Sequence, residues 1–447
     1  MSNATTEPKP TKSLRDADLK ATLQHLRQTD NLTNWYYLAR TYLYFVLVLG
    51  STLYFFAHRE SWELSWAWNV PVAILAVILV GAGQHQLSAL AHEGVHHILF
   101  RGRYLNDLAC DFLAMFPLFS NTYHYRLQHL AHHQFVNDLD RDPDISQMKT
   151  SGHWLDFPVS KKTFLRTLLK QLFLPNLIRF MRIRAKYNAM GTDKNPYMKK
   201  GKPLSKVAVK VGLLYILAMI GTLTGLYYVG DPVLLAIVPA VLWIGMIVAF
   251  AKLPDDKFHQ SRVHPVISMR MVSIYRLTYI TVIFVTLAWL TVWTGEWAAG
   301  YFLLLWILPL FTSFAFFMIL RQWVQHGNGD RGWLTNTRVF FVSPFIRFAV
   351  FPMGQDLHLP HHLYASIPHY RLRKLHDALM EYPEYREEAV VVEGYFAPRY
   401  VGQKNPTVLD VLGPQYSLHT DEVYIDHSVM DDGDFEEKEE IMAQGKA

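Results

Sequence analysis

The sequence has one cysteine, Cys110, among its 447 residues. A single thiol cannot form a disulfide within the chain, and it excludes a zinc or iron–sulfur site built on several cysteines. Any metal bound by this chain must therefore be held by nitrogen and oxygen atoms. A signal peptide is not recognisable either, because the N-terminal stretch carries charges and no apolar core. We therefore expect no cleaved leader.

Charged residues are scarce in several long apolar runs that lie in the middle of the chain. Hydrophobic residues make up 51% of the sequence and aromatic residues 14%, which is rich for a soluble protein. Six runs are long enough to cross a bilayer core as helices, which takes roughly 20 residues. They cover residues 37–57, 67–87, 207–229, 233–253, 277–293 and 301–320. We therefore expect an all-α integral membrane protein with about six transmembrane helices.

Cations are nearly missing from the short links inside each pair of runs. Residues 58–66 contain only Arg59, and residues 230–232 and 294–300 contain no Lys or Arg. The long links carry Arg101, Arg103, Lys194, Lys199, Lys200, Lys202 and Lys206. Because cytoplasmic loops are enriched in Lys and Arg, this pattern places both termini and the long links in the cytoplasm. The alternative, buried helices of a soluble enzyme, does not explain six runs with one charge polarity.

Histidine is concentrated in three short clusters. They are His92, His96 and His97; His129, His132 and His133; and His358, His361 and His362. Residues three or four apart on a helix share a face, so these spacings direct imidazoles at a common ion. So many imidazoles exceed the four ligands of a structural zinc and the roughly three of a catalytic zinc, which predicts two metal ions. Imidazole ligands alone do not identify the metal, because they suit zinc, copper, nickel and iron alike.

Pro360 lies inside the third cluster and constrains its structure. Proline is tolerated only in the first turn of a helix, so we expect a helix starting near Pro360, with His358 reaching in from the preceding loop. A shared metal site also requires all three clusters on one side of the membrane. The apolar stretches 105–119 and 339–353 are short and interrupted by polar residues and proline. We interpret them as re-entrant or interfacial.

The order HxxxHH, HxxHH and HxxHH, separated by paired apolar runs, resembles the membrane fatty acid desaturase superfamily. The resemblance covers residues 37–382 and includes HHLYASIPHYRL at 361–372, which is similar to the HHL(F/Y)PSIPxYxL segment of many acyl-lipid desaturases. Ala365 stands where that segment usually has proline. The resemblance implies a cytoplasmic helical cap with two histidine-bound irons, molecular oxygen as co-substrate, and hydrogen removal from an unactivated carbon–hydrogen bond.

Gln322 and His326 follow the last apolar run and lie four residues apart, hence on one helical face. The pair is similar to the AsnxxxHis pair that some acyl desaturases place after their last span, with Gln322 in place of asparagine. The resemblance implies that His326 is a further metal ligand and that Gln322 is a partner of a metal-bound water. The alternative is an ordinary interfacial histidine. The predicted metal ligands are thus His92, His96, His97, His129, His132, His133, His326, His358, His361 and His362.

Other polar residues receive plainer interpretations. The histidines without a predicted metal role include His85, His124, His153, His259 and His264. We expect the first three to be structural or solvated and assign no role to the last two. The acidic run 138–144 either supplies partners for the imidazole N–H groups of the second cluster or is a solvated loop. The basic stretch 161–186 is expected to lie in the lipid headgroup plane, and a net charge of +5 gives no reason to expect nucleic acid.

We predict oxygen-dependent desaturation of a fatty acyl chain, whether free, thioester or lipid-linked. Hydroxylation or ketolation of a carotenoid or another lipid is the alternative, because the motifs do not separate these outcomes. A zinc-dependent membrane hydrolase or a non-catalytic receptor would leave most of the clustered histidines unexplained. The His-Pro-Gly-Gly motif of a fused cytochrome b5 is missing, so electrons are expected from a separate ferredoxin or cytochrome b5 type protein. The expected organisation is a polar tail over 1–34, a membrane domain over 35–385 and a cytoplasmic extension with an acidic end over 386–447.

Overall fold

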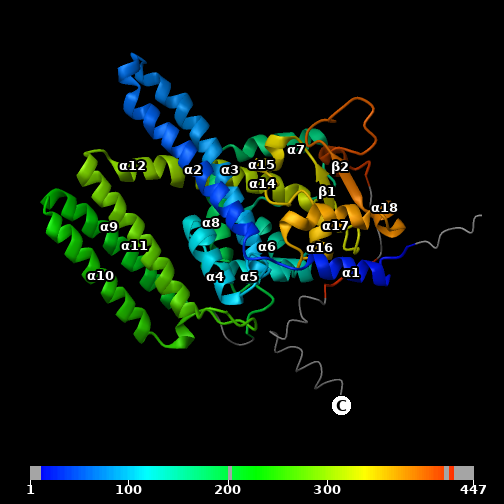
Figure 1. Cartoon of the computed structure of the whole chain (residues 1–447), viewed down its shortest axis with the longest axis horizontal. Helices are drawn as coiled ribbons and strands as arrows, with labels where there is room; N and C mark the ends of the chain where they lie inside the picture. Colours follow the sequence, from blue (N-terminus) through cyan, green and yellow to red (C-terminus); the bar gives the residue numbers. More distant parts are fainter. Residues whose placement is uncertain (1–11, 200–203, 417–421, 427–447) are drawn as a thin grey trace, which may run out of the picture.

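A computed structural model describes residues 12–199, 204–416 and 422–426 of the protein, and this part is built almost entirely from helices (Figure 1). Six helical segments are long and apolar enough to cross a membrane. They are α2 (Thr33–His58), α3 (Asn69–Val95, with a short preceding turn), α9 (Val207–Val229), α10 (Pro232–Lys252), α11 (Met269–Thr294) and the segment Ala298–Gln325. They coincide with the six apolar runs, so the all-α membrane architecture is confirmed. The acidic residues 431–440 lie outside the described residues.

The last spanning segment is not one regular helix. It consists of α12 (Ala298–Phe302), a π-helical turn over Leu303–Ile307, α13 (Leu308–Phe311) and α14 (Ser313–Gln325). Trp306 ties the π-helical turn to its surroundings. Its carbonyl accepts a hydrogen bond from Gln84 Nε2 at 2.8 Å, and its indole N–H donates to the carbonyl of Pro117 at 2.9 Å. The irregular turn is therefore held in place from two sides.

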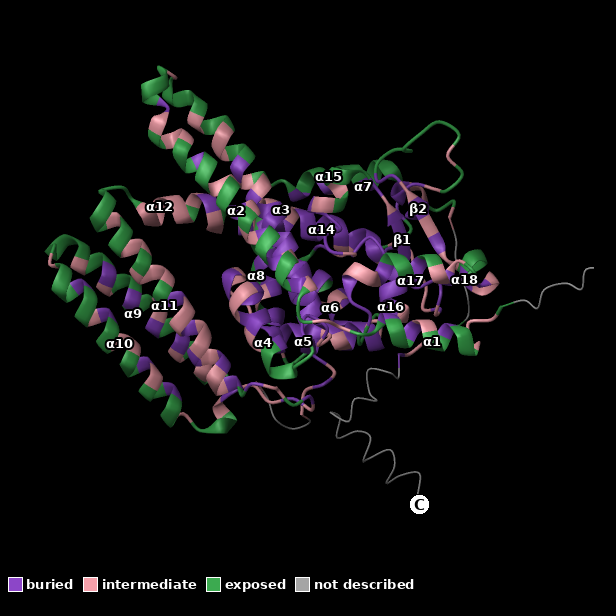
Figure 2. Cartoon of the chain, in the orientation of Figure 1, coloured by how far each residue is buried: buried purple, intermediate pink, exposed green. Residues whose placement is uncertain are grey.

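α3 and α14 pack against each other at the centre of the molecule, and Gly81 allows their close approach. A Cβ atom at Gly81 would lie 2.0 Å from Ser313 Oγ and 2.6 Å from the backbone nitrogen of Phe314. Only glycine lets the two backbones come this near. Residues 80–95 of α3 are all buried, and buried residues gather around α3, α5 and α14 in Figure 2. α3 runs beyond its predicted end at residue 87 because protein, rather than lipid, encloses this half of the helix.

α9, α10 and α11 form a separate bundle beside this centre (Figures 1 and 2). Their exposed apolar residues include Leu214, Leu217, Ile237, Val241 and Ile244. Hydrogen bonds inside the bundle join Tyr215 to Thr281 at 2.6 Å and Trp243 Nε1 to Thr278 Oγ1 at 2.9 Å. A bundle with polar contacts inside and apolar side chains outside is what a lipid environment requires.

Shorter helices surround the ends of α3 and α14 (Figure 1). They are α1 (Ala17–Leu26), α4 (Arg103–Cys110), α5 (Thr122–Gln134), α6 (Pro143–Ser151), α7 (Lys161–Gln171), α8 (Leu174–Asn188), α15 (Pro344–Ala349), α16 (His358–Leu363), α17 (Leu372–Leu379), α18 (Pro383–Glu388) and α19 (Val408–Val411). The stretch 105–119 contributes to α4 and to two further helical turns, and it is not among the spanning segments. This agrees with the prediction that it does not cross the membrane.

A small parallel sheet joins two distant parts of the chain. β1 (Arg338–Phe341) pairs with β2 (Val390–Glu393). The stretch 339–353, which we expected to be re-entrant or interfacial, is therefore partly a strand, followed by α15. β2 lies beyond the expected domain boundary at residue 385, and its Val392 belongs to the same core as residues of α14. The division into three parts stays a prediction.

Candidate metal centre

Nine histidines from four parts of the chain form two adjoining groups. The first group contains His92, His96, His129, His133 and His361, and the second contains His132, His326, His358 and His362. In each group, one nitrogen of every ring lies within 4.8 Å of the chosen nitrogens of the other rings. Every predicted ligand except His97 belongs to one of the two groups.

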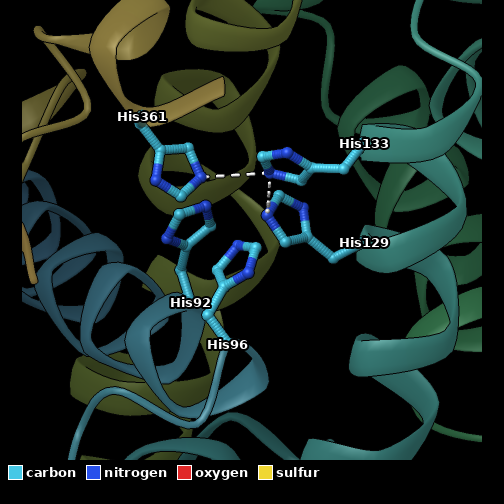
Figure 3. Close-up of side chains that lie close together, drawn as sticks. All are labelled: His92, His96, His129, His133 and His361. Atoms are coloured by element: carbon cyan, nitrogen blue, oxygen red, sulfur yellow. Dashed lines mark hydrogen bonds between the residues drawn. The ribbon is translucent and has the colours of Figure 1, made fainter. Parts of the chain in front are cut away.

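The first group is assembled by α3, α5 and α16 (Figure 3). His92 and His96 lie one turn apart at the C-terminal end of α3, and His129 and His133 lie one turn apart on α5. Nε2 of His133 is 3.0 Å from Nε2 of His129 and 3.1 Å from Nε2 of His361. The ring centre of His92 is 4.3 Å from that of His129 and 4.4 Å from that of His361. All five rings therefore converge on one point.

The second group combines α5, α16 and the residue that ends α14. Nε2 of His326 is 3.1 Å from Nε2 of His132 and 2.9 Å from Nε2 of His358, and Nε2 of His362 is 3.2 Å from Nε2 of His358. α16 begins at His358, two residues before the expected start, so His358 is helical and not in the preceding loop. Pro360 still lies in the first turn, where its missing N–H is not needed. His358 and His362 are consequently one turn apart and face the same point.

The spacing of these nitrogens suits metal ions. Two ligands with metal–nitrogen bonds of about 2.1 Å in tetrahedral or octahedral geometry lie about 3.0–3.4 Å apart. The Nε2 pairs are separated by 2.9–3.2 Å. A neutral imidazole has one N–H, so the rings cannot all donate to one another. Both nitrogens of His92 and Nε2 of His96 are buried without a partner. The residues fit one metal ion in each group.

Acceptors hold the outward nitrogens of two rings in the second group. His132 Nδ1 lies 3.0 and 3.1 Å from the two carboxylate oxygens of Asp142, and His326 Nδ1 lies 3.0 Å from the carbonyl of Asn336. An N–H fixed on Nδ1 leaves the Nε2 lone pair free for a metal. Asp142 belongs to the acidic run 138–144, so this run does provide one partner for the second cluster.

Burial sets the charge of most of these rings. It lowers the pKa of His129 and His133 well below the usual value for histidine, and that of His361 to about 3. These rings are neutral near pH 7, which is the form that binds metals. Burial also lowers the pKa of His132, but the carboxylate of Asp142 outweighs this effect and raises the pKa to about 9.

The arrangement agrees with a family profile. The profile of the family described as "Fatty acid desaturase" matches residues 66–266 and 251–392, which together cover more than half of the chain. The chain belongs to this family. The predicted membership of the desaturase superfamily is confirmed. The family is one of oxidoreductases, and this member has six candidate membrane-spanning helices.

Two known desaturases are similar to parts of the chain. The dihydrorhizobitoxine desaturase of Bradyrhizobium elkanii is 29% identical over 157 residues, which are 35% of this chain and 40% of that protein. The Delta(5) fatty acid desaturase fat-4 of Caenorhabditis elegans is 40% identical over 70 residues, 16% of each chain. The matched parts span less than half of either relative. They support desaturation or a related oxidation at the level of the family.

His97 lies outside both groups, although it was predicted to be a ligand. α3 ends at Val95, and His97 has a positive φ of 57°, so its ring leaves the helix face that carries His92 and His96. Its Nδ1 is 3.5 Å from Asp107 Oδ1 and 3.3 Å from Arg126 Nη2. His97 therefore belongs to the polar contacts that close the end of α3. We leave it out of the proposed ligand set.

Gln322 lines the same cavity as His132 and His326. It lies one helical turn before His326, as the spacing predicts, and its Oε1 is buried without a hydrogen-bond partner. A role beside a metal-bound water stays a prediction. His85, about two helical turns before His92, has its Nδ1 2.7 Å from the carbonyl of Ala349, which fits the expected structural role.

Sequence reasoning missed two arginines in this site. A cavity of about 280 Å³ beside the histidines is lined by Arg184 of α8 and Arg321 of α14. A signal was available for Arg321, because a charged residue inside an apolar spanning segment is by default a candidate functional residue. Nothing in the sequence distinguishes Arg184 from its basic neighbours Arg182 and Lys186, which are exposed on the same helix.

Proposed function

We propose that this desaturase holds two iron ions, one in each histidine group, and uses molecular oxygen to desaturate a fatty acyl chain. The observation that carries the proposal is the division of nine imidazoles, seven of them buried and two half-buried, into two groups with metal-like nitrogen spacing. The identity of the metal comes from the family, because imidazole by itself also suits zinc, copper and nickel. The iron pair would supply the oxidising power needed to break unactivated carbon–hydrogen bonds.

The chain's own residues position the ligands and shield the substrate. α3, α5 and α16 are rigid supports for the rings, and Asp142 and the carbonyl of Asn336 orient two of them. The cavity beside the groups has apolar walls that include Trp154, Phe157 and Trp323. Such walls exclude water from the carbon atoms to be oxidised. Four electrons in total reduce oxygen to two waters: two leave the substrate with two protons, and two come with two further protons from a donor.

The electron donor is proposed to be a separate protein of the ferredoxin or cytochrome b5 type that approaches from the cytoplasm. The C-terminal ends of α3 and of α14 both lead into the histidine groups. Between these two ends the chain passes through four spanning segments, which are α9, α10, α11 and the segment that ends in α14. An even number of crossings returns the chain to the same side. The basic links also belong to that side, which supports a cytoplasmic metal site.

Metal and product analysis test the proposal together. Purified desaturase is expected to hold about two irons per chain, measured by elemental analysis. Lipid extracts of expressing cells, compared with extracts of cells that express the His361→Ala variant, are expected to contain a product with one more double bond. One zinc and no iron would contradict the proposal and favour a hydrolase, and no bound metal would favour a non-catalytic receptor.

Hydroxylation or ketolation is the second candidate function. The histidine motifs do not separate it from desaturation, and the name of the bacterial relative, dihydrorhizobitoxine desaturase, does not mention a fatty acid. In this alternative the substrate is a carotenoid or another lipid. Mass spectrometry separates the outcomes, because desaturation removes two hydrogens from the product whereas hydroxylation adds one oxygen.

A further inference from the structure

Two buried arginines line the cavity beside the histidines, and neither forms an ion pair with a carboxylate in the described part of the chain. Arg184 is 9% exposed and Arg321 is 6% exposed. Nε and Nη1 of Arg321 are buried and make no hydrogen bond, and its Nη2 lies 3.7 Å from the sulfur of Met318. Among the described residues, no carboxylate forms an ion pair with either guanidinium. The negative charge of Asp144 acts on both guanidinium groups, but this carboxylate is partly exposed and forms an ion pair with neither. Two positive charges at the cavity therefore share one distant negative charge.

Such an arrangement calls for an anion from outside the chain. Burying a guanidinium without a counter-ion is unfavourable. Asp144 lines the same cavity, but its carboxylate is 39% exposed and lies 4.0 Å from Nδ1 of His132. Asp142 already accepts from His132. The planar guanidinium matches the two oxygens of a carboxylate or a phosphate.

The arginines are close to the proposed metal ligands. Cζ of Arg184 is 5.9 Å from the ring centre of Tyr125, which is itself 5.7 Å from the ring centre of His129. Arg321 lies five residues before His326, or about 7.5 Å of helix rise. Both histidines line the cavity with the arginines. An anion between the two guanidinium groups would thus share one cavity with the carbon atoms that face the histidines.

A second cavity of about 300 Å³ meets the first one at Tyr125 and Arg184, which line both. Its apolar wall residues include Leu118, Phe119, Ile307, Leu310, Phe311 and Phe314. Hydrocarbon is the chemistry that suits such walls. The two cavities together offer an anion site with an apolar compartment beside it.

We propose that Arg184 and Arg321 bind an oxyanion of the substrate, so that this desaturase acts on an amphiphile with a free carboxylate or phosphate and not on a neutral ester. The inference rests on the proposed function, because it specifies the substrate class for the same cavity. The apolar part of the substrate occupies the second cavity. A carboxylate and a phosphate present the same chemistry to the arginines, and the experiment separates them.

Ligand binding to the purified, iron-loaded desaturase in lipid nanodiscs tests this inference. The probes are dodecanoate, methyl dodecanoate and dodecyl phosphate, and the readout is the dissociation constant from isothermal titration calorimetry. The wild type is expected to bind one of the two anions at least about tenfold more tightly than the ester, which is the effect of one charge-assisted contact. The tighter anion identifies the oxyanion. Equal affinity for all three probes would overturn the proposal.

Variants assign the effect to the arginines. Arg321→Gln and Arg184→Gln are each expected to weaken anion binding about tenfold or more while ester binding stays the same, and Arg321→Lys is expected to retain part of the preference. Arg182→Gln is the matched control, because Arg182 is exposed on the same helix as Arg184. A preference that survives both glutamine variants would overturn the proposal, as would its loss in the control.

Thermal unfolding separates ligand binding from a structural role. Removal of an unpaired buried charge is expected to leave the melting temperature of ligand-free Arg321→Gln equal to or above that of the wild type, whereas a structural arginine would lower it. Binding is repeated after chelation of the metal, because a carboxylate can also bind iron. An anion preference that disappears on chelation contradicts the arginine site. Low iron content with an intact preference would instead contradict only the proposed function.

Discussion

The pair α3 and α14 and the bundle α9, α10 and α11 are both apolar and long enough to cross a membrane, yet they are built differently. In the most apolar part of the last span, 50% of the residues are buried inside the protein, whereas the corresponding share is 17–22% in the three bundle helices. Polar residues of α3 are tied to neighbouring backbones, as in the bonds from Gln84 to Trp306 and from Gln86 to Phe348. Apolarity alone therefore does not show which helices face lipid. Polar side chains inside an apolar helix indicate that protein encloses it, and here they lie on a helix that carries the candidate site.

The largest expected difference concerns the histidines at the enclosed ends of the helices. His361→Ala and His132→Ala are each expected to abolish product formation and to lower iron content, because each removes one imidazole from a group that shares an ion. Product is measured by gas chromatography of lipid extracts and iron by elemental analysis. His264→Ala, which changes an exposed histidine between α10 and α11, is expected to keep both. Full turnover in either ligand variant would refute the shared site.

The end of α14 offers a finer comparison within one helix. His326→Ala is expected to lose part of the iron and to reduce turnover by at least about 100-fold, because His326 contacts two rings of the second group. Gln322→Ala is expected to keep the iron and to reduce turnover less. Normal iron content and turnover in His326→Ala would show that the site consists of the three clusters alone.

The stability contributions of two ion pairs, one in the enclosed region and one at the exposed bundle, can be compared. Arg126 donates to both oxygens of Asp107 at 2.8 and 2.6 Å in a buried pair, whereas Arg270 contacts Asp255, which is 88% exposed. Asp107→Asn is expected to lower the free energy of unfolding by about 3–5 kcal/mol, because it leaves Arg126 buried and uncompensated. Asp255→Asn is expected to change it little. Urea titrations followed by circular dichroism measure both changes, and equal losses would contradict the comparison.

The same pair has a pH dependence with a definite sign. Burial acts to raise the pKa of Asp107, but the hydrogen bonds and charge of Arg126 outweigh it and hold the pKa well below the usual range. The pair therefore stabilises the protein fully above the unfolded pKa of about 3.9, and this contribution is lost as the pH falls through the folded value. Wild type and Asp107→Asn are thus expected to converge in stability only in strong acid.

The smallest expected effect concerns helix contacts. Gly81→Leu is expected to destabilise the protein by about 1–3 kcal/mol or more, because its side chain would overlap Ser313 and the backbone of Phe314. Gly221→Leu in α9 is the matched control, since no atom lies within 4 Å of a Cβ atom at this position. Its melting temperature is expected to stay at the wild-type value. Equal tolerance of both changes would argue against close packing of α3 on α14.

Local patterns predicted much of this protein. Apolar runs gave the six spans, and the i, i+3 and i, i+4 spacings placed His129 beside His133 and Gln322 one turn before His326. The sequence patterns did not predict features that depend on the tertiary structure. His97 directly follows another histidine, as His133 and His362 do, but its ring lies beside Asp107 at the end of α3.

The arginines and the sheet show the same limit. Arg184 and Arg321 line one cavity although more than a hundred residues separate them, and β1 pairs with β2 although the paired residues Arg338 and Val390 lie about 50 residues apart in the sequence. No period or spacing in the sequence encodes such a contact, because it depends on how whole helices and loops pack. Only the presence of a charge in an apolar span hinted at Arg321.

The π-helical turn over Leu303–Ile307 fixes the rotational phase of everything that follows it. One residue of an α-helix corresponds to about 100° of rotation around the axis. A single residue removed from this turn would therefore swing the continuing helix by roughly a quarter of a turn, and Arg321 and Gln322 would leave the cavity while the span stayed equally apolar. Hydropathy would not register such a deletion. The length of this segment, counted in single residues, is thus as much a part of the site as the side chains that line it.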